Sequence, residues 1–481
     1  MRRLGLLACL ALAAVAQPLP ERIAKVLEGP VARRTFWGIQ VLDLDRREIL
    51  AEVNPQHFFL PASNTKLFTT ALALVRLGPD YRFRTRVVAM EQPDAEGRLR
   101  GDLYLIGGGD PTLSNRAYPY VKGPKSGNPL QGIEELADQV WQAGVRRVEG
   151  DVIGDDTAYV WEPYPDGWAL DDAVWEYGAP VSALSVNDNT IQIQLRAGRE
   201  GEPVSVRLSP PLDYYLVDSR VRVEPGSARL LIERLPGSRQ LRLWGSLPPR
   251  EQRMISVAVV DPALYAAQAL LDALRRRGVV VTGRAVARHR YANDSAGPPA
   301  EGIELARRES PPLVEILRVI DKVSQNLHAE IVLREVGRVA RGEGSREAGL
   351  AEMAAFLDEI GIARTEYRFL DGSGLSRLNL VTPAAIVRLL EFMYRSPHRE
   401  AWISLLPIGG EDGTLAARFG GAPAARRIRA KTGTLSLSNA LSGYAESPRG
   451  PLAFAILANN ALAPAAEVRA AIDKITLLLA E

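Results

Sequence analysis

The sequence predicts an α/β (α+β) protein in which one split domain is interrupted by inserted segments. Two stretches of alternating apolar and polar residues, 35–44 and 48–53, predict a strand pair near the start of the chain. Three more, 427–434, 440–446 and 452–459, predict strands near its end. Because both ends carry strands and helical patterns lie between them, we expect one domain with an antiparallel sheet between helices.

Helical periodicity accounts for most of the remaining chain outside the middle. The expected helices of the split domain cover 313–320, 327–341, 346–361, 383–394 and 463–479. The last of these contains charged residues at 467, 469, 473 and 474, so we expect it to pack on the core and not to anchor the chain in a membrane.

The middle of the chain has a different character. Residues 109–183 are rich in turns, contain four of the seven tryptophans and include a predicted helix at 133–143. From 184 to 287 short strands dominate, with one helix at 262–276, and a polar stretch at 290–301 resembles a linker. We therefore expect a main domain formed by 18–80 and 308–481, a β-rich insertion formed by 81–108 and 184–307, and a second nested insertion at 109–183.

Composition and the N-terminus bound the functional classes. The chain has 481 residues, and a net charge of +2 gives no reason to expect nucleic-acid binding. Residues 1–17 combine two arginines, an apolar run and a small-residue cleavage site, which predicts a signal peptide; a short buried helix is the alternative. Cys9 is the only cysteine, and it lies within this predicted signal peptide. The mature chain would therefore contain no cysteine and would fold outside the cytoplasm without disulfides. No later stretch is long and apolar enough to predict a transmembrane segment.

Ser63 begins the stretch that carries the first chemical signal. Residues 68, 71, 72 and 75 repeat at the spacing of a buried helix face, and Gly78-Pro79 predicts its end. On this helix Ser63 and Lys66 share one face a turn apart. A lysine that loses its proton can activate a serine hydroxyl, so the spacing favours Ser63 as a nucleophile.

Two further motifs lie far along the chain. Ser324-Gln325-Asn326 falls between two predicted helices, and Lys431-Thr432-Gly433 falls on a predicted strand. S-x-N alone is a weak signal, since it also occurs at 126–128 and 185–187, where it suggests turn or loop chemistry. The order S-x-x-K, S-x-N, K-T-G on helix, turn and strand is typical of serine acyl-transferases that recognise penicillin.

These motifs suggest a separate chemical role for each of their residues. Lys66, kept partly neutral by the charge of Lys431, would take the proton of Ser63. Ser324 would pass a proton to the leaving amine, and Asn326 would orient Lys66. Gly433 would leave room for a substrate strand, and the N–H groups of Ser63 and Thr434 would form an oxyanion hole. The hydroxyls of Thr432 and Thr434 suit a terminal carboxylate.

Other enzyme classes find little support. The four histidines show no H-E-x-x-H pattern, which argues against a zinc peptidase. No G-x-S-x-G motif accompanies His328, which reads as an ordinary helix residue, and Gly107-Gly108-Gly109 lacks the lysine of a phosphate-binding loop. We expect neither a metal nor a cofactor.

Beyond the three motifs, the chain resembles the class C low-molecular-mass penicillin-binding proteins, the D-alanyl-D-alanine carboxypeptidase/endopeptidases. The resemblance rests also on Asp371–Arg377, on Leu406–Ile408 with Glu411–Thr414, and on Ala179–Leu184. It implies a β-lactamase/transpeptidase-like domain with two nested inserted domains. Ser63 and Ser324 are 261 positions apart (324 − 63), which leaves room for such insertions.

The resemblance also implies roles for Trp168, Asp171 and Arg377. Matching positions in related enzymes contact the free end of the diamino acid in the peptidoglycan stem. An Asp and an Arg suit a group with both an amine and a carboxylate, although a surface salt bridge explains the same pair equally well.

The expected function is that of a serine-type D-Ala-D-Ala carboxypeptidase or D,D-endopeptidase. It would act on peptidoglycan stem peptides through a Ser63 acyl-enzyme and would be inhibited by β-lactams. A β-lactamase with fast deacylation and a non-enzymatic cell-wall binding protein are the alternatives. The expected location is the periplasm or cell envelope, or the medium after secretion. The sequence leaves the oligomeric state open.

Overall fold

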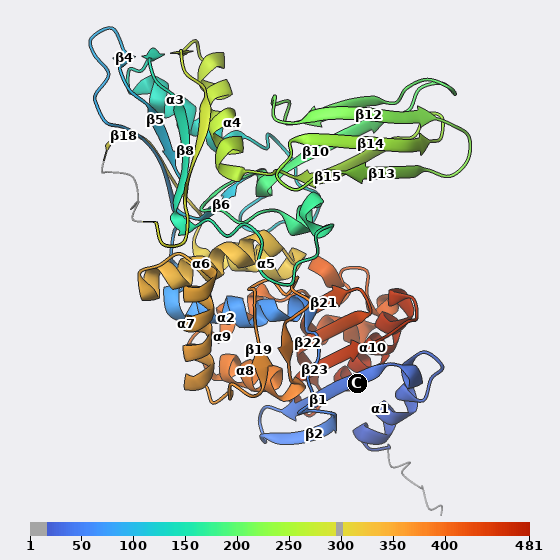
Figure 1. Cartoon of the computed structure of the whole chain (residues 1–481). Coiled ribbons are helices and arrows are strands. Elements are labelled where there is room, and N and C mark those ends of the chain that lie inside the picture. The colour runs from blue at the N-terminus through green and yellow to red at the C-terminus, as the bar shows by residue number, and fades with distance from the viewer. Residues whose placement is uncertain (1–16, 295–301) are drawn as a thin grey trace, which may run out of the picture.

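The computed structural model describes residues 17–294 and 302–481 (Figure 1). The predicted signal peptide, 1–17, therefore lies outside the described residues except for Gln17. So does most of the predicted linker, although strands end at Arg290 and begin at Ile303 on either side of it.

The main body is built on one antiparallel sheet that joins the two ends of the chain. Its strand order is β2-β1-β23-β22-β21. The strands are β1 (Phe36–Asp43), β2 (Glu48–Val53), β21 (Ile428–Leu435), β22 (Ser438–Ser447) and β23 (Gly450–Asn459). Two strands from the start of the chain thus continue a sheet made by three strands from its end.

Helices cover both faces of this sheet (Figure 1). They are α1 (Leu19–Leu27), α2 (Thr65–Leu77), α5 (Leu313–Val323), α6 (Asn326–Arg341), α7 (Arg346–Glu359), α8 (Pro383–Arg395), α9 (Arg399–Leu405) and α10 (Ala465–Ala480). Alternation along β23 separates two cores: Ala455 and Leu457 face the core of α2 and α5–α9, whereas Phe454 and Ile456 face that of α1 and α10. A small pair, β19 (Tyr367–Arg368) and β20 (Leu380–Val381), flanks the Asp371 loop.

An upper lobe stands on the main body (Figure 1). Its five-stranded sheet has the order β17-β8-β5-β3-β18, and a smaller one has the order β16-β7-β4. The elements are β3 (Arg84–Ala89), β4 (Arg98–Leu99), β5 (Leu103–Ile106), α3 (Gln131–Gln142), β7 (Arg147–Val148), β8 (Val152–Val160), α4 (Pro262–Arg276), β16 (Val280–Val281), β17 (Ala285–Arg290) and β18 (Ile303–Glu309). A parallel pair, β6 (Asp110–Leu113) and β9 (Leu184–Val186), lies beneath it.

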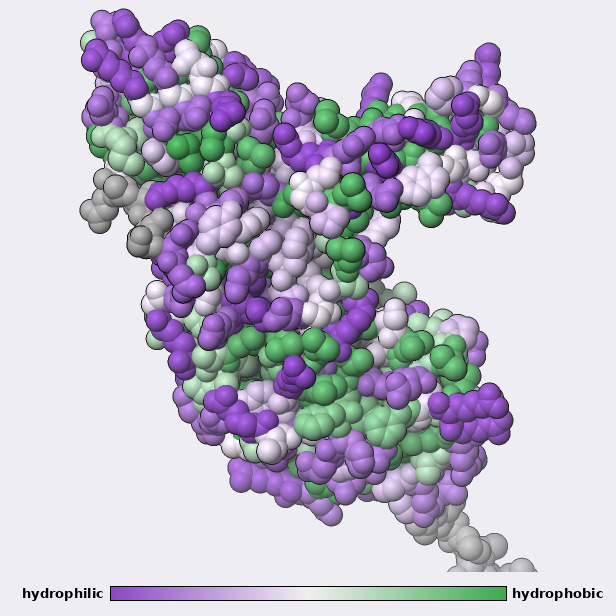
Figure 2. Space-filling model, viewed as in Figure 1, coloured by the Kyte–Doolittle hydropathy of each residue, from purple (hydrophilic) through white to green (hydrophobic). Residues whose placement is uncertain are grey.

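A second lobe projects sideways from the upper one. It contains two three-stranded sheets, β11-β10-β15 and β12-β14-β13. Their strands are β10 (Thr190–Arg196), β11 (Ser205–Ser209), β12 (Leu216–Val223), β13 (Arg229–Glu233), β14 (Gln240–Leu247) and β15 (Gln252–Ala258). Figure 2 shows a surface hollowed between this lobe and the main body.

The expected division of the insertions into 81–108 with 184–307 and a separate 109–183 stays a prediction. Strand β8 falls within 109–183, yet it pairs with β5 and β17, which lie on the other side of that division.

Candidate active site

Ser63 lies in a tight turn at the entrance of helix α2. A 3-10 turn covers Ala62–Asn64, and the α-helix proper starts at Thr65, so Ser63 precedes the helix on which the sequence placed it. Ala62 has a positive φ of 49°, a conformation that non-glycine residues adopt only under constraint. The constraint comes from buried Asn64, whose amide donates to the Lys431 carbonyl at 2.9 Å and accepts from Ser442 Oγ at 2.7 Å. The turn is thereby tied to strands β21 and β22.

Lys66 lies fully buried one turn after Ser63. Its Nζ is 2.9 Å from Ser63 Oγ, 2.6 Å from Asn326 Oδ1 and 2.5 Å from the Ser373 carbonyl oxygen. These three contacts come from three segments that are far apart in the chain. The structure thus brings Ser63, Lys66 and Asn326 together.

The surroundings hold the pKa of Lys66 well below its usual value. Burial is the main cause, and the positive charge of Lys431 adds to it; the carboxyl groups of Asp371, Glu330 and Asp321 oppose both. A lysine with a lowered pKa spends more of its time neutral near pH 7. At hydrogen-bond distance from a serine hydroxyl, it has the geometry and the basicity of a general base.

Lys431 and Ser324 form a second hydrogen-bonded pair beside the first. Lys431 Nζ donates to Ser324 Oγ at 2.9 Å and to the Thr432 carbonyl at 2.9 Å. Ser324 terminates helix α5 in the left-handed conformation, with φ 62°, and Asn326 starts α6. Burial lowers the pKa of Lys431, whereas the nearby Asp321 carboxylate raises it. Burial in turn raises the pKa of Asp321, against the pull of Lys431.

A rigid loop positions the carbonyl oxygen that Lys66 contacts. Glu330 Oε1 accepts from the N–H groups of Gly372 and Ser373, both at 2.8 Å. Asp371 accepts from the N–H groups of Gly374 and Ser376, again at 2.8 Å. The run Asp371–Arg377 stood out in the sequence only as part of a resemblance. Two glycines around Ser373 indicate a turn, but nothing local shows that its carbonyl reaches Lys66.

Strand β21 forms the wall opposite the helices. It is the last strand of the sheet, and the segment 407–409 covers only its first half: Gly409 donates to the Ile428 carbonyl, and Ala430 to that of Pro407. Among the described residues, no backbone group bonds to the outer edge from Thr432 to Leu435. This open edge suits an extended peptide.

Gly433 allows this strand to approach Ser63 closely. A Cβ atom at Gly433 would lie 2.5 Å from the Pro61 carbonyl oxygen and 3.2 Å from Ser63 N. The nearest atom therefore belongs to the serine turn, whereas the sequence suggested room for substrate. Beside it, Thr432 donates to Thr414 Oγ1 at 2.8 Å, and Thr434 is exposed.

The three residues implied by resemblance lie around the Asp371 loop. Trp168 Nε1 donates to Asp371 Oδ2 at 2.9 Å, so Trp168 supports the loop that contacts Lys66. Arg377 donates to Asp172 Oδ2 at 2.8 Å, and this contact raises its pKa. Asp171 is exposed, and its negative charge also raises the pKa of Arg377. The direct ion pair, however, is made by its neighbour Asp172.

The surroundings of His328 bear on a catalytic role for this histidine, and the helix lengths bear on a transmembrane segment. His328 is buried on α6 and its Nε2 lies 3.0 Å from Asp188 Oδ1, so it pairs away from Ser63. In residues 17–294 and 302–481, no helix combines the length and apolarity needed to span a membrane.

Comparisons with known proteins give a consistent result. A model of the D-Ala-D-Ala carboxypeptidase 3 (S13) family matches residues 19–481. The D-alanyl-D-alanine carboxypeptidase of Actinomadura sp. (strain R39) is 36% identical over 464 residues, which cover 93% of this chain and 82% of the relative. The D-alanyl-D-alanine carboxypeptidase DacB of Haemophilus influenzae is 25% identical over 425 residues, covering 86% and 83%.

The same fold occurs among solved structures. The crystal structure of penicillin binding protein 4 (dacB) from Haemophilus influenzae superimposes with a TM-score of 0.82 at 24% identity. The superposition covers 95% of this chain and 98% of the other. The expected mixed α/β fold is thereby confirmed.

Proposed function

Because this chain belongs to the D-Ala-D-Ala carboxypeptidase 3 (S13) family, we propose that it cleaves peptidoglycan stem peptides through an acyl-enzyme on Ser63. The family and its relatives make the chain a serine-type D-Ala-D-Ala carboxypeptidase. The observation that carries the proposed role of Ser63 is the 2.9 Å contact between its hydroxyl and the buried amine of Lys66.

In the acylation step, Ser63 Oγ attacks the carbonyl carbon of the penultimate D-Ala while neutral Lys66 takes the hydroxyl proton. The N–H groups of Ser63 and Thr434 receive the oxyanion, and each such donor contributes roughly 3–4 kcal/mol to the transition state. Ser324, held at 2.9 Å by Lys431, gives its proton to the departing amine and is reprotonated by the proton that Lys66 took from Ser63, so Lys66 is neutral again. The bond to the terminal D-Ala breaks as the ester to Ser63 forms.

In the second step, water attacks this ester and gives a proton to Lys66, which passes it to the departing Ser63 oxygen and so regenerates the hydroxyl. Before this, in the acylation step, the hydroxyls of Thr432 and Thr434 bind the carboxylate of the terminal D-Ala, and Gly433 keeps the strand close to the Ser63 turn. β-Lactams acylate the same serine. Their ester hydrolyses slowly, which separates a penicillin-sensitive peptidase from a β-lactamase.

The test is release of D-Ala from a stem pentapeptide ending in D-Ala-D-Ala. Wild type should release one D-Ala per peptide, and Ser63→Ala should release none. Steady hydrolysis of penicillin without D-Ala release would instead identify a β-lactamase. Binding of stem peptide with neither reaction would identify a non-enzymatic wall protein.

We further propose that Trp168, Asp171 and Arg377 receive the free end of the stem's diamino acid. The ion pair between Arg377 and Asp172 holds the guanidinium in place and leaves the exposed Asp171 carboxylate for the amine. Stems with a diamino acid that ends in amine and carboxylate should be preferred over stems with lysine. Arg377→Ala should remove this preference; an unchanged preference would mean that Arg377 is only a structural salt bridge.

The predicted signal peptide supports export to the periplasm or cell envelope. Cleavage after Ala16, at the small-residue site, would give a chain that starts at Gln17, and N-terminal sequencing of the protein from the cell envelope or medium should show this start. An intact N-terminus on cytoplasmic protein would overturn this proposal.

A further inference from the structure

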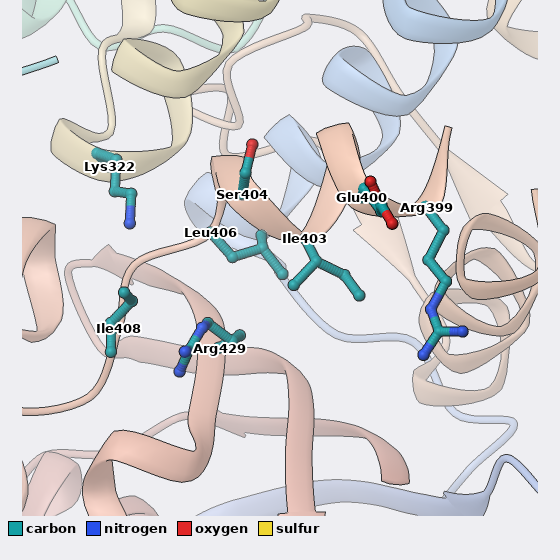
Figure 3. A pocket seen from close by; sticks show the side chains of 8 residues that line it. All are labelled: Lys322, Arg399, Glu400, Ile403, Ser404, Leu406, Ile408 and Arg429. Atoms are coloured by element: carbon teal, nitrogen blue, oxygen red, sulfur yellow. The ribbon is translucent and has the colours of Figure 1, made fainter. Parts of the chain in front are cut away.

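A basic pocket lies behind the Ser324 turn, between helices α5 and α9 and strand β21. Its volume is about 540 Å³, and Lys322, Arg399 and Arg429 reach it from these three elements (Figure 3). In Figure 3 the amine of Lys322 and the guanidinium of Arg429 extend into the same space from opposite sides. Ile403, Leu406 and Ile408 supply an apolar wall.

The positive charge of this pocket is only partly compensated. Lys322 pairs with Asp412 at 2.5 Å. Arg429 donates only to the carbonyl oxygens of Arg426 and Ile428, and no carboxylate among the described residues pairs with it. Arg399 lies over the Tyr394 ring, 3.8 Å from its centroid. Glu400 is the one acidic residue that lines the pocket. An anionic ligand would therefore find unused donors here.

The same segments continue from the pocket into the active site. Arg429 precedes Lys431 by two residues on β21 and shares its face, about 7 Å away at strand spacing. Lys322 precedes Ser324 by two residues at the end of α5. Asp412, the partner of Lys322, precedes Thr414, which accepts a hydrogen bond from Thr432. The pocket thus adjoins the side of the site toward which the leaving amine departs.

We propose that this pocket binds the carboxylates of the acceptor peptide when the substrate is a D,D-cross-link. The inference rests on the proposed function, because that function places the departing amine beside Ser324. A terminal D-Ala ends at Thr432, whereas the leaving group of a cross-link continues as a second stem peptide with free carboxylates. Lys322, Arg399 and Arg429 supply the positive charge that receives these carboxylates, and the apolar wall contacts the intervening methylene groups.

Two substrates and three variants test this subsite. D-Ala release from a pentapeptide monomer and cleavage of a purified D,D-cross-linked dimer are measured for wild type, Arg429→Ala, Arg399→Ala and Arg426→Ala. Arg426 is exposed, lies three residues before Arg429 and does not line the pocket, so its variant is the matched control for loss of charge. The ratio of dimer cleavage to monomer cleavage should fall about tenfold in the first two variants and stay constant in the control. Arg399→Ala keeps the test valid if Arg429→Ala folds poorly.

The outcomes separate this proposal from the one on Ser63. An unchanged ratio in both pocket variants overturns the subsite, as does a wild-type enzyme that releases D-Ala but leaves the dimer intact. In either case the Ser63 mechanism stands. If wild type fails to release D-Ala and is not acylated by penicillin, the proposed function itself fails.

Discussion

Replacing Gly433 by alanine should slow acylation by displacing the Ser63 turn. The added Cβ would lie 2.5 Å from the Pro61 carbonyl oxygen, whereas ordinary contacts begin near 3.4 Å. Pro61 must therefore move away by about 0.9 Å (3.4 − 2.5), because the obstacle is backbone and cannot rotate aside. Ser63 follows Pro61 by two residues in the same turn, so its hydroxyl moves as well.

The size of the effect follows from this displacement. A reacting group that is misplaced by about 1 Å loses roughly a factor of 100 in rate. Overpacking of this kind also lowers the free energy of unfolding by about 1–3 kcal/mol. We therefore expect an acylation rate constant about one hundredfold lower in a protein that is still folded.

The assay is the second-order rate of acylation by a fluorescent penicillin, with thermal unfolding measured on the same samples. Gly101→Ala is the control, because no atom lies within 4 Å of its Cβ position and its φ is ordinary. Acylation of Gly433→Ala at the wild-type rate would refute the close approach of β21 to Ser63.

Three other predictions concern the groups around Lys66. Lys66→Ala should lower the acylation rate by about 10²–10⁴, the usual contribution of a general base. In wild type, the acylation rate should fall on the acidic limb of the pH–rate profile, because Lys66 becomes protonated there. Lys431→Gln removes a positive charge that lowers the pKa of Lys66. The pKa of Lys66 should therefore rise in this variant, and the acidic limb should move to higher pH. An unmoved limb would mean that Lys431 does not act on the base. Asn64→Ala leaves the Lys431 carbonyl and Ser442 unpaired, which should lower the free energy of unfolding in denaturant by about 1–3 kcal/mol.

Local sequence patterns were sufficient for the sheet and the motif residues. The alternation in 35–44 and 452–459 predicts strands that in fact pair as β1 and β23. The three-residue spacing of Ser63 and Lys66 fixes their proximity regardless of the rest of the fold. By contrast, residues 216–223 carry only a weak strand pattern although they form β12, because only Val221 and Val223 are buried and positions 218, 220 and 222 are charged.

Contacts that arise only in the folded chain could not be predicted. The Ser373 carbonyl reaches Lys66 because Glu330, on another helix, holds the loop by its N–H groups. The ion-pair partner of Arg377 is Asp172 and not its neighbour Asp171. Which of the two carboxylates reaches the guanidinium depends on the turn that carries both. Sequence spacing reports which residues share a face but not which backbone group faces them.

The central claim is that Ser63 is the acylated nucleophile. Wild type and Ser63→Ala are incubated with a labelled penicillin, digested, and analysed by mass spectrometry for the peptide that carries residue 63. We expect a penicilloyl mass shift on Ser63 in wild type and no adduct in Ser63→Ala. No adduct on wild type, or an adduct that persists in Ser63→Ala, would contradict it.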